Sequence, residues 1–408
     1  MHWQARGAPS SRLTRINTPG PSTAKGVYFK IAGCMVVNPR SKEAELVDVG
    51  VKDGIIDAVG EVRARADRVF DAQRDYVCPA LVDLHSHVYH LGTSLGVDPD
   101  WVASRWGTGV FADAGSSGAG NFAGFLEHVI KRSSSRIYAF LNIGFGGIPF
   151  FGIQGGQQAG EVPDMRVADE EACAGCIERN REHIVGVKVR VSENANGALG
   201  AELIRAAKRC ARKAGVPVMV HFGRSPPEVK EVLSLLEKGD ILTHAFRPGP
   251  NSIVDEGGHV MREAWDARRR GVVFDVGHGS GSFSYGTARA ALAEGFRPDT
   301  ISTDLHAFSA ASPVVSLETT MTKMLGLGME VEEVILAATH SPAAALGRPV
   351  HGSIAVGRPA DLVTLRVSAA RKELKDSAGE GVAFEREVKP VLRLKGEDVR
   401  MLPAAAQP

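Results

Sequence analysis

Two histidines that are one residue apart follow a hydrophobic stretch in the segment "ALVDLHSHVYH", which begins at Ala80. If the stretch forms a β-strand, His85 and His87 point to the same side, because residues i and i+2 share a face of a strand. Imidazole nitrogens are common ligands of Zn²⁺ and related metal ions. A lone histidine at a strand end is more often a buried structural residue, so the pair predicts a metal site only if further ligands accompany it.

Further residues of suitable chemistry accompany other apolar segments. Lys188 interrupts the apolar run "IVGVKVR", and His221 ends the run "VPVMVH". His244 and Asp304 follow the shorter runs "DILT" and "TIST". A polar or charged side chain is unfavourable in a buried strand unless it is paired or bound. Because packing alone explains such a set poorly, we predict one metal centre, formed by His85, His87, Lys188, His221, His244 and Asp304.

Separate segments can supply one centre only if the fold brings their ends together. Between residues 76 and 349, short apolar segments alternate with helical stretches, which is typical of β–α units around a parallel sheet. The predicted strands lie at residues 76–84, 109–115, 136–144, 184–190, 216–223, 240–246, 271–279 and 300–306. Eight units predict an α/β fold, a (β/α)₈ TIM-like barrel, which keeps its active site at the carboxyl ends of the strands.

Both ends of the chain carry β segments that stand apart from these units, such as "YFKIAGCMVV" and "GSIAVGRPADLVTLRV". We expect residues 26–75 and 350–408 to form one small β-sandwich domain beside a barrel domain of residues 76–349. Residues 1–25 contain no acidic residue and no long apolar run, so a secretory signal is not expected. Their Arg and Ser content resembles a transit peptide, but a disordered N-terminal tail or an over-extended start is favoured.

The composition indicates which kinds of molecule the protein is expected to bind. The chain has 408 residues, 44% of them hydrophobic, with 48 basic and 47 acidic residues and a net charge of +1. This balance gives no reason to expect a nucleic-acid partner, and no apolar run approaches the roughly 20 residues of a membrane helix. Five cysteines are few for this length and favour a reduced, cytoplasmic setting. We expect a small-molecule substrate, a homo-oligomeric assembly, and neither a nucleic-acid nor a membrane partner.

The predicted ligand set resembles that of the amidohydrolase superfamily. Its binuclear members have H-x-H after strand 1, a lysine on strand 4, histidines on strands 5 and 6, and an aspartate on strand 8. Residues 28–365 follow this layout, including the flanking β-sandwich. The segments "PALVDLHSHVY", "GVKVR", "VMVHFG", "LTHAF", "DVGHGSGSFS" and "STDLH" look like the dihydroorotase-like branch, and most like its amidohydrolase/deacetylase subgroup.

The resemblance implies a centre of two divalent metal ions, with Zn²⁺ the expected metal. The histidines of the H-x-H motif would hold the more buried ion together with Asp304, and the histidines of strands 5 and 6 would hold the other. Lys188 would react with CO₂ to form a carbamate that bridges both ions. Two such ions lower the pKa of a bridging water, and Asp304 would act as the catalytic residue that transfers its proton to the leaving group.

Four other residues are candidates for substrate contacts. Arg190 lies two positions after Lys188, and Arg224 lies in the loop after strand 5, so either could clamp a carboxylate. A surface salt bridge remains the alternative for both. His278 lies in the loop after strand 7, and His306 lies two residues after the predicted aspartate ligand.

The expected activity is hydrolysis of an amide or ester bond in a small acylated carboxylate, as in a deacetylase. A cyclic-amide hydrolase is the first alternative. It is disfavoured because many dihydroorotases and hydantoinases have H-x-H-x-x-x-R, whereas Tyr89 and His90 follow here and the next arginine is Arg105. A mononuclear deaminase is disfavoured by Lys188, which suggests a bridge. An inactive scaffold would usually have lost ligands, and here all six candidates are present.

Overall fold

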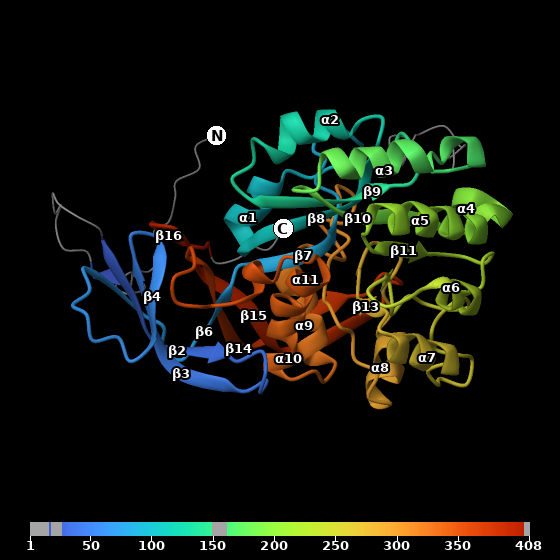
Figure 1. Cartoon of the computed structure of the whole chain (residues 1–408). Coiled ribbons are helices and arrows are strands. Elements are labelled where there is room, and N and C mark those ends of the chain that lie inside the picture. Colours follow the sequence, from blue (N-terminus) through green and yellow to red (C-terminus); the bar gives the residue numbers. More distant parts are fainter. Residues whose placement is uncertain (1–15, 18–26, 149–160, 404–408) are drawn as a thin grey trace, which may run out of the picture.

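Two β-sheets of different kinds organise the chain (Figure 1). The computed structural model describes residues 16–17, 27–148 and 161–403. A seven-stranded sheet forms the barrel, and a nine-stranded sheet built from both ends of the chain stands beside it. The predicted tail of residues 1–25 lies outside the described residues, except for the short strand β1 (Ile16–Asn17), which joins the nine-stranded sheet.

The barrel sheet follows the chain order, and each strand pairs in parallel with the next. Its strands are β7 (Leu81–Ser86), β8 (Thr108–Gly118), β9 (Arg136–Asn142), β10 (Ile184–Val191), β11 (Val218–Phe222), β12 (Ile241–Thr243) and β13 (Val273–Asp275). Almost all their residues are buried, because helices cover the outside of the sheet and side chains fill the inside. This double burial explains why the strands are nearly continuous apolar runs in the sequence.

The eighth predicted strand, residues 300–306, closes the barrel without forming a regular strand. Thr300 bridges Asp275 at the end of β13, and Leu305 bridges Ser86 at the end of β7, both in the parallel sense. Between them Asp304 has a left-handed backbone with φ of 49°, which a β ladder cannot accommodate. The predicted barrel is confirmed, with seven regular strands and one irregular closing segment.

Helices follow the strands and pack around the barrel (Figure 1). They are α1 (Pro99–Trp106), α2 (Phe122–Phe125) with the π-helix η1 (Leu126–Ile130), α3 (Glu170–Arg179), α4 (Glu193–Asn196), α5 (Gly200–Ala214), α6 (Val229–Leu235), α7 (Arg262–Arg270), α8 (Tyr285–Ala293), α9 (Leu317–Gly326), α10 (Val331–Ala337) and α11 (His340–Ala345). In α5, Leu203, Ala207 and Ala211 recur at helical spacing and are buried, and Gly215 ends the helix in a left-handed conformation.

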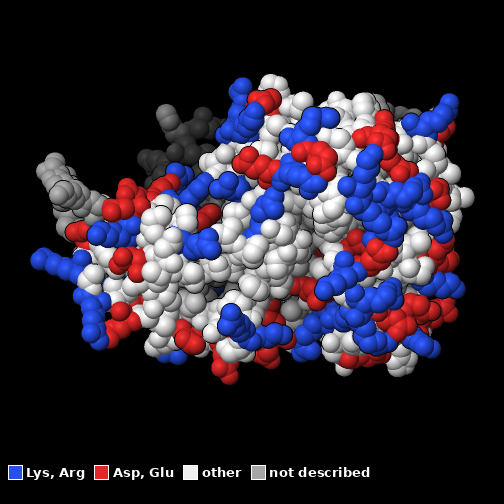
Figure 2. All heavy atoms as spheres, in the orientation of Figure 1, with Lys and Arg blue, Asp and Glu red and all other residues white. Residues whose placement is uncertain are grey.

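The outer surface of the barrel is charged. Figure 2 shows basic and acidic side chains interspersed over the face that carries α5, α6 and α7. Some of these charges pair across neighbouring helices, as Arg209 of α5 does with Glu170 of α3 at 2.7 Å. Exposed pairs of this kind each contribute little to stability, about 0–1 kcal/mol. Among the described residues, no helix is long and apolar enough to cross a bilayer.

The second sheet joins the two ends of the chain. Its remaining strands are β2 (Tyr28–Val37), β3 (Ala44–Lys52), β4 (Ile55–Gly60), β5 (Arg68–Asp71), β6 (Tyr76–Pro79), β14 (Asp361–Lys375), β15 (Gly381–Lys395) and β16 (Asp398–Met401). β6 connects the ends, because it pairs with β2 on one side and with β14 on the other. The expectation of one sheet built from both ends is therefore confirmed.

Two details of this sheet differ from the predicted elements. The stretch at residues 76–84 is not one barrel strand, because β6 belongs to the end sheet and β7 starts the barrel after Ala80. The hairpin of β14 and β15 is longer than its predicted apolar segment, and β15 packs on α9. Its turn at residues 376–380 reaches the loop after β13, where Ser377 donates a backbone hydrogen bond to the carbonyl of Phe283.

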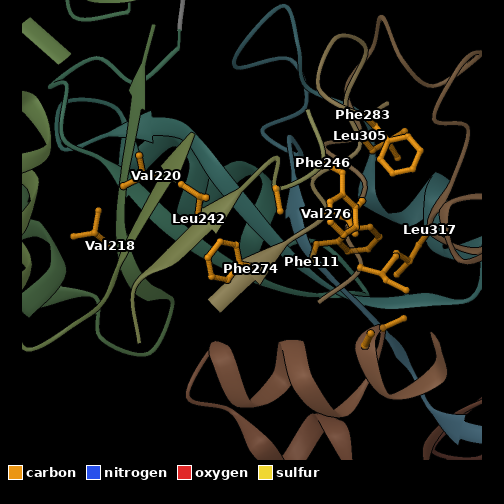
Figure 3. Close-up of a cluster of buried hydrophobic side chains, with 14 of the residues drawn as sticks. Phe111, Val218, Val220, Leu242, Phe246, Phe274, Val276, Phe283, Leu305 and Leu317 are labelled. Carbon is orange, nitrogen blue, oxygen red and sulfur yellow. The ribbon is translucent and has the colours of Figure 1, made fainter. Parts of the chain in front are cut away.

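Apolar layers lie on both sides of the barrel wall. Outside, side chains such as Phe111, Val220 and Phe274 pack in a continuous layer with the helices, part of which Figure 3 shows. Inside, Leu84, Met219 and other apolar residues form a plug that includes Ala343 of α11. The interior is therefore filled below the level at which the strands end, and polar side chains lie above the plug.

Candidate metal centre and active site

Three predicted ligands meet where the closing segment reaches β7. His85 Nε2 and His87 Nε2 lie 3.3 Å and 3.1 Å from Asp304 Oδ1. The backbone sets this arrangement, because the amide of Asp304 donates to the carbonyl of His85 and the amide of His87 donates to the carbonyl of Leu305. The pair of histidines thus faces one carboxylate, as the H-x-H spacing predicted.

The other three predicted ligands adjoin this group. His221 Nδ1, at the end of β11, lies 2.7 Å from His244 Nε2, which follows β12. His244 Nε2 lies 3.9 Å from Asp304 Oδ2. Lys188 Nζ, on β10, lies 3.2 Å from His85 Nε2. The structure therefore brings all six residues together, with Asp304 between the two histidine pairs.

Burial sets the protonation states of these groups. It lowers the pKa of His85 and of His221 well below the usual value and that of His244 to about 4. It also lowers the pKa of Lys188 to about 8, although nearby Asp304 opposes this shift. Burial raises the pKa of Asp304, but the surrounding histidines hold it well below its usual range. Neutral imidazoles and an ionised carboxylate are the forms that bind divalent metals.

Hydrogen bonds behind the histidines select their tautomers. Thr243 Oγ1 donates to the Asp275 carboxylate at 2.7 Å and must therefore accept from His85 Nδ1, also at 2.7 Å. His244 Nδ1 donates to the carbonyl of Gly277 at 2.5 Å. In both rings the Nε2 lone pair is left to face the centre. Such partners orient metal-binding histidines and raise their basicity.

The Asp275 carboxylate anchors the contact to His85. Thr300 and Ser302 also donate to it, at 2.7 Å and 2.6 Å, so three hydroxyls including that of Thr243 satisfy it. Burial raises its pKa to about 6, and the three hydroxyl donors oppose the rise. The carboxylate is thus ionised at neutral pH and holds the Thr243 hydroxyl proton in place.

Two ligands occupy left-handed backbone conformations that non-glycine residues seldom adopt. His244 has φ of 67° and Asp304 has φ of 49°. Residues in such regions persist only where the surrounding structure holds them, and they concentrate at functional sites. Nearby Gly279, with φ of 58°, makes room for this geometry, since a Cβ there would lie 2.5 Å from Asp304 Oδ2.

A cavity of about 260 Å³ opens above the ligands. Its lining consists of His87, Leu95, Ile148, Glu161, Lys188, Arg190, Ser192, Asn194, His221, Gly223, Arg224, Arg247, Ser280, Gly281, Ser282, Asp304 and His306. Three of the four predicted substrate contacts, Arg190, Arg224 and His306, lie in this lining. The volume is below the roughly 300–1,000 Å³ that is typical for drug-sized ligands, which fits a small substrate.

His278 lies behind the cavity wall and not in its lining. Its ring is fully buried and stacks on Phe283, with ring centroids 4.5 Å apart. Nδ1 lies 2.9 Å from the carbonyl of Gly279, and Nε2 lies 2.8 Å from Lys323 Nζ. Lys323 also donates to the carbonyls of Pro313 and Lys375, so it connects the loop after β13 to the β14–β15 hairpin.

Sequence reasoning missed several residues of the site. Arg247 and Glu161 line the cavity, and Glu161 pairs with Arg190 at 3.7 Å. Thr243 and Asp275 act behind His85. Arg247 could have been found from its position three residues after a ligand histidine, the same offset as that of Arg224. The other three carry no local pattern, because their roles depend on contacts between distant segments.

A larger cavity of about 1000 Å³ lies at the amino ends of the barrel strands, opposite the ligands. Charged residues in its lining are largely paired with one another. Lys208 pairs with Asp240 and with Glu237, and Arg268 pairs with Asp299. Cavity size therefore does not mark the reactive end of this barrel, whereas the convergence of ligand atoms does.

The donor set fits divalent metal ions. His85, His244 and Asp304 each offer one ligand atom, and these atoms lie within 4.8 Å of one another. The tautomers leave nitrogen lone pairs facing inward, and nitrogen and carboxylate donors suit Zn²⁺ and its neighbours in the periodic table. Lys188 is buried beside these atoms, and no carboxylate of the described residues forms an ion pair with it.

Comparison with known proteins agrees with this geometry. The model of the amidohydrolase family matches residues 76–396. The chain is 37% identical to a deacetylase of Brucella anthropi over 83% of this chain and 84% of that protein, and 37% identical to a deacetylase of Agrobacterium fabrum over 83% and 82%. A crystal structure of a dihydroorotase is 33% identical, covers 93% of this chain and 99% of its own, and superposes with a TM-score of 0.86. The chain therefore belongs to the amidohydrolase family and is a hydrolase.

Proposed function

We propose that this chain is a binuclear metal-dependent hydrolase that removes an acyl group from a small carboxylate, cleaving an amide or ester bond as a deacetylase does. The observation that carries the proposal is the convergence of six ligand side chains beneath a small cavity. The two relatives named deacetylases, each 37% identical to this chain, support the acyl-transfer class.

The residues divide into two ligand groups. His85, His87 and Asp304 would hold one ion, and His221 and His244 would hold the other. When bound, two such ions, with Zn²⁺ the expected metal, supply a hydroxide nucleophile at neutral pH and polarise the acyl carbonyl. The protein contributes the fixed histidine tautomers, the buried setting and the shape of the cavity.

Lys188 is proposed to carry a carbamate. Its Nζ lies 3.2 Å from His85 Nε2 of one ligand group, and Lys188 lines the same cavity as His221 of the other group. The neutral amine would form an N–C bond to CO₂, one C=O electron pair would move to oxygen, and the nitrogen would release a proton. The product shares one negative charge between two oxygens and could offer one oxygen to each ligand group, which an ammonium cannot do.

Asp304 is proposed to transfer protons. Its carboxylate lines the cavity and is held ionised by His85, His87 and His244. An ionised carboxylate at this place can accept a proton from the attacking water and return it to the leaving amine or alcohol. Asp304 leaves the strand conformation, with φ of 49°, and it lines the cavity.

A cyclic-amide hydrolase is the second candidate, because the crystal structure that resembles this chain at TM-score 0.86 is described as a dihydroorotase. The loop after β7 disfavours it. At the position of the arginine in H-x-H-x-x-x-R, this chain has Leu91, an exposed apolar residue that cannot bind a carboxylate. Leu91 is not among the residues that line the cavity.

The test is a substrate screen with the zinc-loaded protein. N-acyl amino acids, O-acyl hydroxy acids and cyclic amides would be compared by acid release and by loss of the ring. We expect release of acetate or another short acid from one of the first two classes. Rapid opening of dihydroorotate or a hydantoin, without acyl release, would support the second candidate instead.

A further inference from the structure

Two neighbouring loops of the cavity repeat one pattern. Each ligand histidine of strands β11 and β12 is followed three residues later by an arginine, in "HFGR" ending at Arg224 and "HAFR" ending at Arg247. β11 and β12 pair directly, with His221 opposite Thr243, so the two loops leave the barrel side by side. Both arginines line the same cavity as His221 and Asp304.

The positive charges of these two arginines line one cavity and act on each other. Burial lowers the pKa of Arg247, and the charge of Arg224 lowers it further. In the part of the chain that the structure describes, neither guanidinium forms an ion pair with a carboxylate, whereas Arg190 pairs with Glu161 at 3.7 Å. The remaining residues, 1–15, 18–26, 149–160 and 404–408, contain no Asp or Glu. Those undescribed residues therefore contribute no carboxylate that could pair with Arg224 or Arg247.

Arg247 is held rigidly by its surroundings. Its Nη1 donates to the carbonyl of Asn251 at 2.6 Å, and its guanidinium lies 5.4 Å from the centre of the Phe222 ring. The side chain of Asn251 is itself fixed, since it donates to the carbonyls of Gly223 and Pro227 at 2.9 Å and 3.0 Å. Arg247 Nε is buried and has no hydrogen-bond partner among the described residues.

We propose that Arg224 and Arg247 form an anion subsite that binds the carboxylate of the substrate. Two like charges in one small cavity repel each other, and a bound carboxylate turns that repulsion into two attractions. This inference rests on the proposed function and assigns its substrate class: a short acyl compound whose carboxylate lies on the β11–β12 side of the cavity.

The two arginines have different roles in this subsite. Arg247 is fixed in place and partly buried, so it orients the carboxylate through charge-assisted hydrogen bonds that few water molecules can replace. Arg224 is exposed at the rim and contributes mainly by attraction through solvent, which salt screens. Arg190, whose charge Glu161 matches, is not part of the subsite.

Binding of non-hydrolysable probes tests the subsite without turnover. The zinc-loaded full chain would be titrated with hexanoate and with the neutral 1-hexanol by calorimetry. Arg247→Met should weaken hexanoate binding more than tenfold and leave hexanol binding unchanged. Arg224→Met should weaken it about two- to fivefold, and raising the salt concentration should abolish that difference. Arg205→Met, an exposed arginine of α5 that pairs with Glu202, is the matched control and should bind like the wild type.

Outcomes separate the subsite from the proposed function. Arginine-dependent hexanoate binding without acyl hydrolysis would support the subsite and contradict the deacetylase assignment. Acyl hydrolysis, together with equal hexanoate affinity in the wild type and in Arg247→Met, would support the deacetylase assignment and contradict the subsite. If Arg247→Met does not fold, hexanoate affinity is measured with Arg247→Lys instead. This variant keeps the charge but loses the paired donors of the guanidinium, so it should bind hexanoate more weakly than the wild type. Unchanged hexanoate affinity in Arg247→Lys and Arg224→Met together would overturn the subsite.

Discussion

The two halves of the metal centre are built in different ways. One half, called the regular half below, rests on the longer strands β7 and β10, which have six and eight residues and carry His85 and Lys188. The other half follows β12 and β13, which have three residues each, and includes the irregular closing segment. In this second half the ligands His244 and Asp304 have left-handed backbones, which none of the first-half ligands has.

The difference shows how a barrel can place ligands that point across its axis. Alternation aims every second side chain of a strand inward, and this suffices for Lys188, which pairs with the interior residue Met219. At His85 the pairing of β7 with β8 shifts register between Asp83 and Ser86, so His85 faces inward directly after the interior residue Leu84. A side chain that must turn toward a neighbour from the strand end needs a backbone that leaves the strand. Gly279 provides room for Asp304 there, and the Gly277 carbonyl holds His244. We therefore expect the irregular half to be sensitive to small backbone changes that the regular half tolerates.

Removal of Lys188 should have the largest effect of any change in the regular half. Lys188→Ala removes the proposed carbamate bridge and leaves Asp304 as the one anionic residue of the ligand set, so metal binding should weaken and activity should fall below detection. Added acetate or propionate can occupy the vacated space and should restore part of the activity. Metal content and turnover with and without the acid are the measurements.

Two further variants sharpen this test. Lys188→Arg should not respond to added acid, because the guanidinium fills the space with positive charge. Lys230→Ala, at an exposed position on α6, controls for loss of a lysine and should behave as wild type. Near-normal turnover of Lys188→Ala without added acid would show that the bridge is not needed.

Asp304 tests the irregular half without removing its geometry. Asp304→Asn keeps the shape and leaves five ligands, so much of the metal should remain bound. An amide cannot accept the proton, and kcat should fall at least about 100-fold, the usual scale of general acid–base catalysis. Measuring kcat and metal content in the same preparation distinguishes proton transfer from metal binding. If metal is lost in proportion to activity, Asp304 acts only as a ligand.

Much of the regular half could be predicted from sequence, and less of the irregular half. Apolar runs mark β7 and β10, and the ligands stand out against them. The closing segment was predicted as an eighth strand because its apolar and polar pattern does not encode the left-handed turn at Asp304. The bond from Thr243 to Asp275 joins residues 32 positions apart and has no local signature. The contact between the β14–β15 turn and the loop after β13, which Ser377 makes with Phe283, likewise depends on tertiary packing.

The link between the two halves can be broken at Thr243, which ends β12 but contacts His85 of β7. Thr243→Val keeps the shape and removes the hydroxyl, so His85 loses the partner that selects its tautomer. Metal affinity should fall about 10- to 100-fold, measured by competition with a chelator. Thr243→Ser retains the hydroxyl and should bind metal like the wild type; equal affinity of the valine variant would show that the contact does not orient His85.

Gly279 offers the smallest test of the irregular half. Alanine there requires a left-handed conformation, which costs about 1–2 kcal/mol, and its Cβ would lie 2.5 Å from Asp304 Oδ2. Gly279→Ala should therefore lower both the free energy of unfolding and the turnover. Gly281→Ala in the same loop has nothing within 4 Å of the added Cβ and should leave stability unchanged. Equal unfolding midpoints for the two variants would contradict the argument from close packing.

The central claim is that six side chains from five barrel segments form one binuclear centre, and the metal content of the purified chain tests it most directly. Protein prepared with ample Zn²⁺ and bicarbonate should contain about two divalent ions per chain, the content of a two-metal site. His85→Ala and His221→Ala remove one ligand from each group, and each should lower the metal content and the activity together. A reproducible content near zero in the wild type, with every ligand intact, would contradict the account.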